Sequence, residues 1–155
     1  MNEMMLKAVD RRTFIIGAGA SAAALAGLSS LAQATPQEAA DFLAKLTGGK
    51  QAAPGKVKLE MPEIAENGAT VPVKVTAETP QNEGDNCKSI AVIATKNPRP
   101  RMCIFHFTPR SGKATAAIRV RLATTQEIWA AAEMSDGSWH IAKTTVKVTI
   151  GGCGG

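Results

Sequence analysis

Between Lys56 and Ile150 the chain is a succession of short runs in which apolar and polar residues alternate, separated by turn residues. The clearest examples are residues 57–60, 71–76 and 138–150, where every second residue is apolar over much of the stretch. Alternation with a period of two is typical of β-strands with one buried face. Because no helical run interrupts these strands, we expect about seven or eight of them in an all-β fold, an immunoglobulin-like antiparallel β-sandwich. A small barrel is the alternative.

The remaining strands are recognised by other signals. Residues 89–95 are almost wholly apolar, as expected of a strand that is covered on both faces, and 102–107 return after a turn rich in proline. Further strands are predicted at 116–122 and 127–133. Asp136-Gly137 then marks the hairpin before the last strand.

A single helix is predicted ahead of the strands. Thr35 suits the N-cap and Pro36 the first helical position, and Gly48-Gly49 end the helix. Its apolar residues recur at helical spacing on one face: Ala39, Phe42, Leu43 and Leu46. We therefore expect a short amphipathic helix that packs against the sandwich.

The first 34 residues have the pattern of an export signal. Arg11-Arg12 form a twin-arginine motif, a weakly apolar Ala/Gly-rich stretch follows to Leu31, and Ala32-Gln33-Ala34 fits a small-x-small cleavage site. We predict a cleaved twin-arginine signal peptide at 1–34, export of the folded protein to the periplasm, and no membrane span in the mature protein. An uncleaved membrane anchor is the alternative. The predicted helix and sandwich then make up one domain at 35–150, followed by a tail at 151–155.

The basic balance of the chain does not indicate nucleic-acid binding. The formal net charge is +5 and the pI is about 9.3. The basic residues are scattered, and no basic run is interleaved with aromatic residues. Weak attraction of anionic ligands or of acidic partner surfaces is the interpretation we favour.

The tail, Gly151-Gly152-Cys153-Gly154-Gly155, follows the last predicted strand without a linker. Five extended residues reach about 17 Å, and glycine leaves such an arm thin and flexible. The tail contains no Lys, Arg or His that would lower the thiol pKa, so Cys153 is expected to react only in the active site of a partner. This pattern favours a covalent carrier over a catalyst. The alternative is a frayed terminus whose odd cysteine forms accidental dimers.

The last ten residues, 146–155, resemble the C-terminus of the SoxY family, the sulfur-carrier subunits of bacterial thiosulfate oxidation. The twin-arginine signal, the N-terminal helix, Asn97-Pro98 and residues 104–107 and 118–123 are similar as well. The resemblance implies that Cys153 bears the sulfur intermediates, with Gly151, Gly152, Gly154 and Gly155 as its flexible arm. It implies no cofactor in this chain.

The resemblance also implies a set of partners. A SoxZ-like subunit without its own signal would form a heterodimer with the chain. A c-type haem complex would join thiosulfate oxidatively to the cysteine, and a dinuclear-manganese hydrolase would release sulfate and leave a persulfide. A sulfur dehydrogenase, where the organism has one, would oxidise the remaining sulfur.

Two further cysteines and two histidines need an explanation. Cys87 and Cys103 either form an intramolecular disulfide or remain two separate thiols, and both alternatives stay open at this point. Their spacing without companion ligands does not suit a metal site. His106 and His140 cannot be placed near Cys153 from the sequence, so no Cys–His catalytic pair is indicated.

Three functions therefore compete. The first is a periplasmic sulfur carrier that is not itself an enzyme. The second is an immunoglobulin-like structural or adhesion module whose tail cysteine crosslinks it to another chain. The third, a thiol oxidoreductase, is disfavoured because the chain has no Cys-x-x-Cys motif and no base near Cys153 in the sequence.

Overall fold

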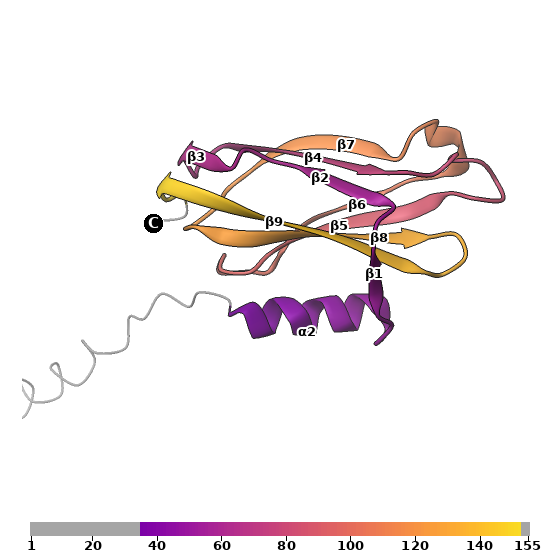
Figure 1. Ribbon diagram of the computed structural model, residues 1–155, viewed down its shortest axis with the longest axis horizontal. Helices are drawn as coiled ribbons and strands as arrows, with labels where there is room; N and C mark the ends of the chain where they lie inside the picture. Colours follow the sequence, from indigo (N-terminus) through magenta and orange to yellow (C-terminus); the bar gives the residue numbers. More distant parts are fainter. Residues whose placement is uncertain (1–34, 153–155) are drawn as a thin grey trace, which may run out of the picture. The chain divides into compact units, whose positions relative to one another are not determined.

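The computed structural model describes residues 35–152, so the predicted signal peptide at 1–34 lies outside the described residues. The described part contains one α-helix, one short 3-10 helix and nine strands (Figure 1). In chain order they are α2 (Pro36–Thr47), β1 (Ala52–Pro54), β2 (Val57–Glu60), β3 (Ile64–Asn67), β4 (Val71–Ala77), β5 (Cys87–Ala94), β6 (Arg101–His106), η1 (Pro109–Ser111), β7 (Thr115–Val120), β8 (Gln126–Met134) and β9 (Trp139–Ile150). No helix in this part of the chain is long and apolar enough to cross a membrane.

Two sheets form the layers of a sandwich (Figure 1). The larger sheet has the strand order β1-β9-β8-β5-β6, with β3 also paired to β9, and the smaller sheet has the order β2-β4-β7. One apolar core lies between them and includes Val73 and Val75 from β4 and Ile90 and Val92 from β5. The predicted all-β sandwich with a short N-terminal helix is therefore confirmed.

Strand β5 is covered on both faces, as its unbroken apolar run predicts. Ile90 and Val92 face the core between the sheets, whereas Ile93 packs with Trp129 of β8 and Ala39 of α2 on the other face of the larger sheet. Burying side chains of this size contributes about 1.5–3 kcal/mol each. Helix α2 thus closes the outer face of the larger sheet.

The ends of α2 form as the sequence predicts. Thr35 and Glu38 make a reciprocal capping box, in which the Glu38 backbone N–H donates to Thr35 Oγ1 at 3.3 Å and the Thr35 N–H donates to Glu38 Oε2 at 3.1 Å. Gly48 ends the helix in the left-handed region at φ 63°. The cap contributes about 1 kcal/mol and fixes where the chain enters the domain.

Two short strands were not predicted. β1 and β3 both pair with β9, and both pairings are parallel, with Ala53 opposite His140 and Ala65 opposite Val148. Neither segment carries an extended alternating pattern, and β1 contains Pro54. Their pairing depends on the long β9, which offers a hydrogen-bonding edge along most of its length. The sandwich is therefore mixed at this edge and antiparallel elsewhere.

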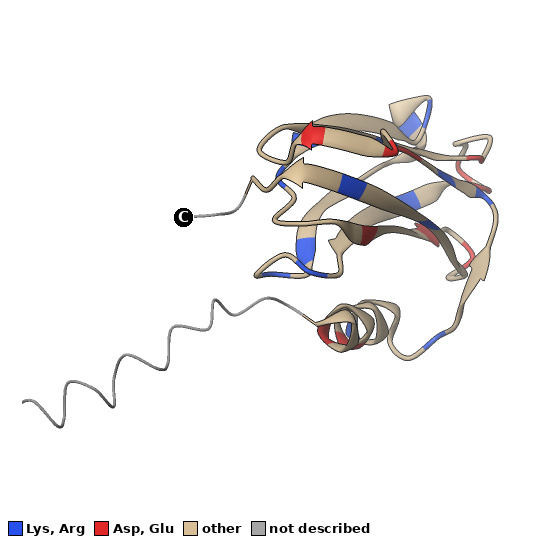
Figure 2. Ribbon diagram, turned by 60° about the vertical axis from the view of Figure 1, so that its left-hand side comes forward, with Lys and Arg blue, Asp and Glu red and all other residues tan. Residues whose placement is uncertain are grey.

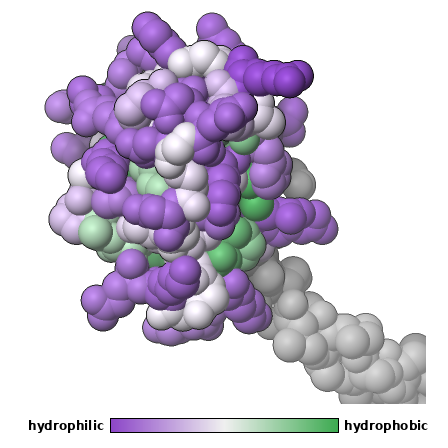
Figure 3. All heavy atoms as spheres, turned by 90° about the vertical axis from the view of Figure 1, so that its right-hand side faces the viewer, coloured by the Kyte–Doolittle hydropathy of each residue, from purple (hydrophilic) through white to green (hydrophobic). Residues whose placement is uncertain are grey.

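The two ends of the sandwich are distinct regions. We call the end where β9 stops and β4 begins the tail end, and the opposite end, with the β8–β9 hairpin at Asp136-Gly137, the far end. Figure 1 shows the tail end on the left and the far end on the right. Viewed face-on in Figure 3, the far end is mostly hydrophilic, with small apolar spots between polar side chains.

Candidate functional site

The start of the C-terminal tail is held by backbone hydrogen bonds at the tail end. The Gly68 N–H donates to the Ile150 carbonyl at 2.7 Å, the Leu122 N–H donates to the Gly68 carbonyl at 2.8 Å, and the Gly152 N–H donates to the Leu122 carbonyl at 2.9 Å. We call this group of four residues the tail anchor. It joins the β3–β4 turn and the segment after β7 to the first residues of the tail.

The glycines at the tail end lie so close to neighbouring backbone that no side chain fits there. A Cβ added to Gly152 would overlap the backbone of Gly68 and the Ala69 nitrogen, and one added to Gly151 would overlap the Ala123 carbonyl oxygen. A Cβ on Gly68 would overlap the Leu122 carbonyl oxygen. Only glycine allows backbones to approach this closely. The chain therefore threads between two loops before it leaves the domain.

This finding changes the expectation for Gly151 and Gly152. The sequence predicts that both belong to a flexible arm, whereas Gly152 is hydrogen-bonded and both are packed against backbone of neighbouring loops. An arm that swings can begin only after Gly152. Cys153, Gly154 and Gly155 lie outside the described residues.

The loop that receives the tail is itself held by two buried amides. Asn97 Nδ2 donates to the Arg121 carbonyl at 2.8 Å, and Asn97 Oδ1 accepts from the Ala123 N–H at 3.0 Å. Gln126 Nε2 donates to Asn97 Oδ1 at 2.8 Å, and Gln126 Oε1 accepts from the Lys96 N–H at 2.8 Å. Buried amides with their hydrogen bonds satisfied make such a loop rigid.

Sequence reasoning missed these supporting residues. Asn67-Gly68 is a turn dipeptide, which indicates a turn after β3, but nothing near it in the sequence indicates that the tail passes there. Asn97 was noted only as part of a resemblance, and Gln126 carries no local signal. Their roles arise from contacts between distant segments.

The two remaining cysteines are separate thiols. Cys103 lies opposite Val92, five residues along β5 from Cys87, which corresponds to about 16 Å. A disulfide requires Cα atoms within about 7 Å. Both cysteines are accordingly free, and the disulfide that the sequence left open does not form.

Burial makes both of these thiols poor nucleophiles. Cys87 is fully buried, and this burial raises its pKa to about 11. Its Sγ–H donates to the Ser89 carbonyl at 3.4 Å, and this hydrogen bond requires the neutral thiol. Burial also raises the pKa of Cys103, which lies half-buried in β6. Because the thiolate is the reactive form, burial lowers the reactivity of both cysteines near neutral pH.

The histidines form no site with a cysteine in the described residues. His106 is exposed at the end of β6, opposite Ser89, and lies at the far end of the sandwich. His140 pairs with Ala132, and its Nδ1 is buried without a hydrogen-bond partner. Within residues 35–152 no three His, Cys, Asp or Glu side chains gather in a way that would hold a metal ion.

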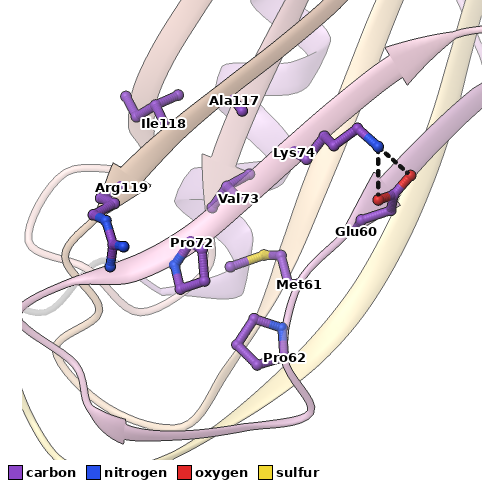
Figure 4. Close-up of a pocket in the computed structure, with 9 residues that line it drawn as sticks. All are labelled: Glu60, Met61, Pro62, Pro72, Val73, Lys74, Ala117, Ile118 and Arg119. Atoms are coloured by element: carbon purple, nitrogen blue, oxygen red, sulfur yellow. Dashed lines mark hydrogen bonds and ion pairs between the residues drawn. The ribbon is translucent and has the colours of Figure 1, made fainter.

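A hollow of about 590 Å³ lies over the smaller sheet (Figure 4). Its lining combines apolar side chains with an ion pair in which Lys74 Nζ lies 3.1 Å from a Glu60 carboxylate oxygen. The lining residues are Glu60, Met61, Pro62, Pro72, Val73, Lys74, Ala117, Ile118 and Arg119. Its one carboxylate, Glu60, is paired with Lys74, and the lining contains no Cys, Ser, Thr or His, so this hollow suits contact rather than chemistry.

Comparison with known proteins agrees with the resemblance in the tail. A family model described as "Sulfur oxidation protein SoxY" matches residues 43–153. The structure is similar to that of the sulfur carrier protein SoxY from Chlorobium limicola f thiosulfatophilum, with 29% sequence identity, a TM-score of 0.61, and coverage of 75% of this chain and 100% of that chain. A search of curated proteins gives no match.

Superoxide reductases share the fold alone. The enzyme (neelaredoxin) from Ignicoccus hospitalis is 17% identical, with a TM-score of 0.55 and coverage of 61% of this chain and 80% of that chain. A putative superoxide reductase from Thermotoga maritima is also 17% identical, with a TM-score of 0.52 and coverage of 64% and 87%. Identity this low says nothing about shared chemistry.

Proposed function

The chain belongs to the SoxY family of sulfur oxidation proteins, and its role is that of a sulfur carrier; we propose that it holds thiosulfate-derived sulfur covalently on Cys153 and presents it to partner enzymes. The observation that carries this proposal is the contrast among the three cysteines. Burial raises the pKa of Cys87 and of Cys103. Cys153 directly follows Gly152, the last anchored residue.

The proposed first step is an oxidative conjugation. The thiol of Cys153 and thiosulfate form one S–S bond, giving Cys153–S–SO₃⁻, and the step releases one proton and two electrons. The electrons go to a c-type haem complex, because the carrier holds no redox group of its own in this proposal. Thiols readily undergo this type of oxidation.

The proposed second step is hydrolysis of the terminal group. Water attacks the sulfonate sulfur, the S–S bond breaks, and sulfate and two protons leave while a persulfide stays on Cys153. A dinuclear-manganese hydrolase supplies the activated water. Where a sulfur dehydrogenase is present, it oxidises the persulfide sulfur while that sulfur remains attached.

The proposed partner subunit and the proposed cellular location are inferred from the same family. We propose a heterodimer with a SoxZ-like subunit in the periplasm, reached in the folded state through the twin-arginine signal at 1–34. The anchored root supports such a carrier, because it places the start of the arm at a fixed point of the domain. An arm with a fixed root and a short reach enters a partner's active site in a limited set of directions.

The carrier function is tested by Cys153→Ser, with Cys103→Ser as the matched control. Both exchange one sulfur for oxygen, but only the first removes the proposed attachment point. We expect Cys153→Ser to abolish thiosulfate-dependent growth and Cys103→Ser to retain it. Intact mass spectrometry after thiosulfate feeding should show sulfur adducts on the wild type and none on Cys153→Ser. Normal growth of Cys153→Ser, or a tail found only in a stable disulfide to another protein, would contradict the proposal.

A further inference from the structure

A cleft of about 380 Å³ opens at the tail end, between the last residues of β7 and the turn that joins β5 to β6. Four arginines line it: Arg99 and Arg101 from the turn and the start of β6, and Arg119 and Arg121 from β7 and the residue after it. We call it the arginine cleft. β6 and β7 are edge strands of the two sheets, so the cleft lies along an open side of the sandwich.

The positive charge of the cleft is not neutralised by carboxylates. The ion pairs within residues 35–152 are Lys58–Glu78 and Lys74–Glu60, and neither involves an arginine. Figure 2 shows basic segments at the end of the sandwich where β9 finishes. The acidic residues Glu63 and Glu66 lie on or next to β3, at the edge opposite β6 and β7. Like charges gathered without counter-charges repel one another and attract anions.

The chemistry of the lining suits an oxyanion. A guanidinium presents several N–H donors in one plane and forms paired hydrogen bonds to oxygens of a carboxylate or phosphate. The sulfonate group offers three oxygens in a similar tetrahedral arrangement. Met102, Ile118 and Val120 form an apolar part of the lining beside the arginines. The cleft is concave, as a site for a small anion is.

The cleft and the tail anchor share a stretch of backbone. Arg121 immediately precedes Leu122, whose carbonyl accepts the Gly152 N–H at 2.9 Å. Asn97, which also lines the cleft, holds the Arg121 carbonyl at 2.8 Å. The next residue after Gly152 is Cys153, with its Cα about 3.8 Å further along the chain. Gly152, the last residue that the structure describes, is therefore bound to the residue next to Arg121 in the lining of the cleft.

We propose that the arginine cleft binds the terminal sulfonate of the cargo on Cys153, an inference that rests on the proposed carrier function. With S–S bonds of about 2.05 Å, a thiosulfonate on Cys153 places its oxygens within about 10 Å of the Gly152 Cα. The cleft then holds the loaded arm against the domain between encounters with enzymes. The persulfide that remains after sulfate release has no oxygens for paired hydrogen bonds, so the arm leaves the cleft.

The first test compares an anionic and a neutral reagent at Cys153. The thiolate attacks a central sulfur of tetrathionate, forms an S–S bond and expels thiosulfate, which leaves Cys153–S–SO₃⁻; iodoacetamide reports the intrinsic reactivity of the same thiol. Trypsin cleavage after Lys147 yields the peptide 148–155, in which Cys153 is the only cysteine, so its modification can be followed by mass. The measured quantity is the rate of modification by tetrathionate divided by the rate of modification by iodoacetamide.

The variants are matched in charge. Arg99→Gln/Arg121→Gln removes two charges from the cleft, and Arg110→Gln/Lys113→Gln removes two exposed charges from the far end. At low salt we expect the rate ratio to fall about 3–10-fold in the first variant and less than about 2-fold in the second. The difference should vanish near 1 M salt. An equal fall in both variants would overturn the proposal.

The second test locates the bound group by NMR of the purified full chain. A thiosulfonate on Cys153 should shift the signals of the four cleft arginines, whereas a neutral methyl disulfide on Cys153 should not. Free thiosulfate added to Cys153→Ser should shift the same signals only at tens of millimolar, because tethering raises the local concentration. Equal shifts from both adducts, or saturation of Cys153→Ser by micromolar thiosulfate, would overturn the proposal. Neither test uses a partner enzyme, so their failure leaves the growth result on Cys153→Ser unaffected.

Discussion

Buried carboxamides hold loops together at both ends of the sandwich. At the far end, Gln81 donates from Nε2 to the Cys87 carbonyl at 3.1 Å and to the Thr108 carbonyl at 3.0 Å, and its Oε1 accepts from the Cys87 N–H at 3.0 Å. At the tail end, Gln126 and Asn97 hold the segment after β7. The same chemistry therefore closes both ends.

The two ends differ in what the held loop supports. The groups bound by Gln81 belong to the start of β5 and to Thr108, whose carbonyl also accepts from the Ser111 N–H of η1 at 2.9 Å. The loop bound by Asn97 and Gln126 receives Gly152. Gln81 thus holds elements of the sandwich to one another, whereas Asn97 and Gln126 hold a loop on which the position of the tail also depends.

The largest expected effect is at Gln81. Gln81→Ala leaves the N–H of Cys87 and the carbonyls of Cys87 and Thr108 without their side-chain partner. We expect the free energy of unfolding to fall by about 3 kcal/mol, measured by denaturant unfolding. Hydrogen exchange of the Gly152 amide should keep its wild-type rate in Gln81→Ala. In Gln126→Ala the same amide should exchange faster than in the wild type. Faster exchange at Gly152 in Gln81→Ala would remove the distinction between the ends.

An intermediate effect is expected at Gly68, with Gly84 as the matched control. A methyl group on Gly68 would overlap the Leu122 carbonyl oxygen, whereas one on Gly84 would meet only Asn82 Oδ1 at 3.6 Å. We expect Gly68→Ala to lower the free energy of unfolding by about 1–2 kcal/mol and to speed exchange of the Gly152 amide about tenfold. Gly84→Ala should remain within about 0.5 kcal/mol of the wild type. Equal behaviour of the two variants would show that the anchor does not hold the tail.

The smallest effect concerns Cys87, at the start of β5. Burial raises the pKa of Cys87 from 9.0 to about 11, so the folded state favours the neutral thiol. Stability from this group is complete below pH 9 and is lost as the pH rises towards 11. Between these values we expect the wild type to lose about 1 kcal/mol more than Cys87→Ala, measured by urea unfolding. Parallel pH curves for the two proteins would contradict the assigned burial.

Much of the fold could be predicted from the sequence, because alternation reports directly on which face of a strand is buried. The stretch 71–76 predicts β4, and the continuous run 89–95 predicts that β5 is covered on both faces. β3 could not be predicted, because its residues Ile64–Asn67 pair with β9 only after the rest of the sandwich is in place. Local pattern contains no information about such a partner.

The candidate site could be predicted only in part. A glycine pair such as Gly151-Gly152 fits a flexible arm and a tight backbone crossing equally well, since the missing Cβ serves both. The roles of Arg101 and Arg121 were also hidden, because each alone is an ordinary exposed residue on an edge. They come together only through the packing of two sheets.

The tail anchor has a consequence for folding order. It joins Gly68, Leu122 and Gly152, which come from the early, middle and final parts of the domain. Contacts between residues so distant in sequence form late, after the intervening loops have closed. Only a completed sandwich therefore brings together the partners that hold Gly152, so the position of Gly152 reports on whether the domain has folded correctly.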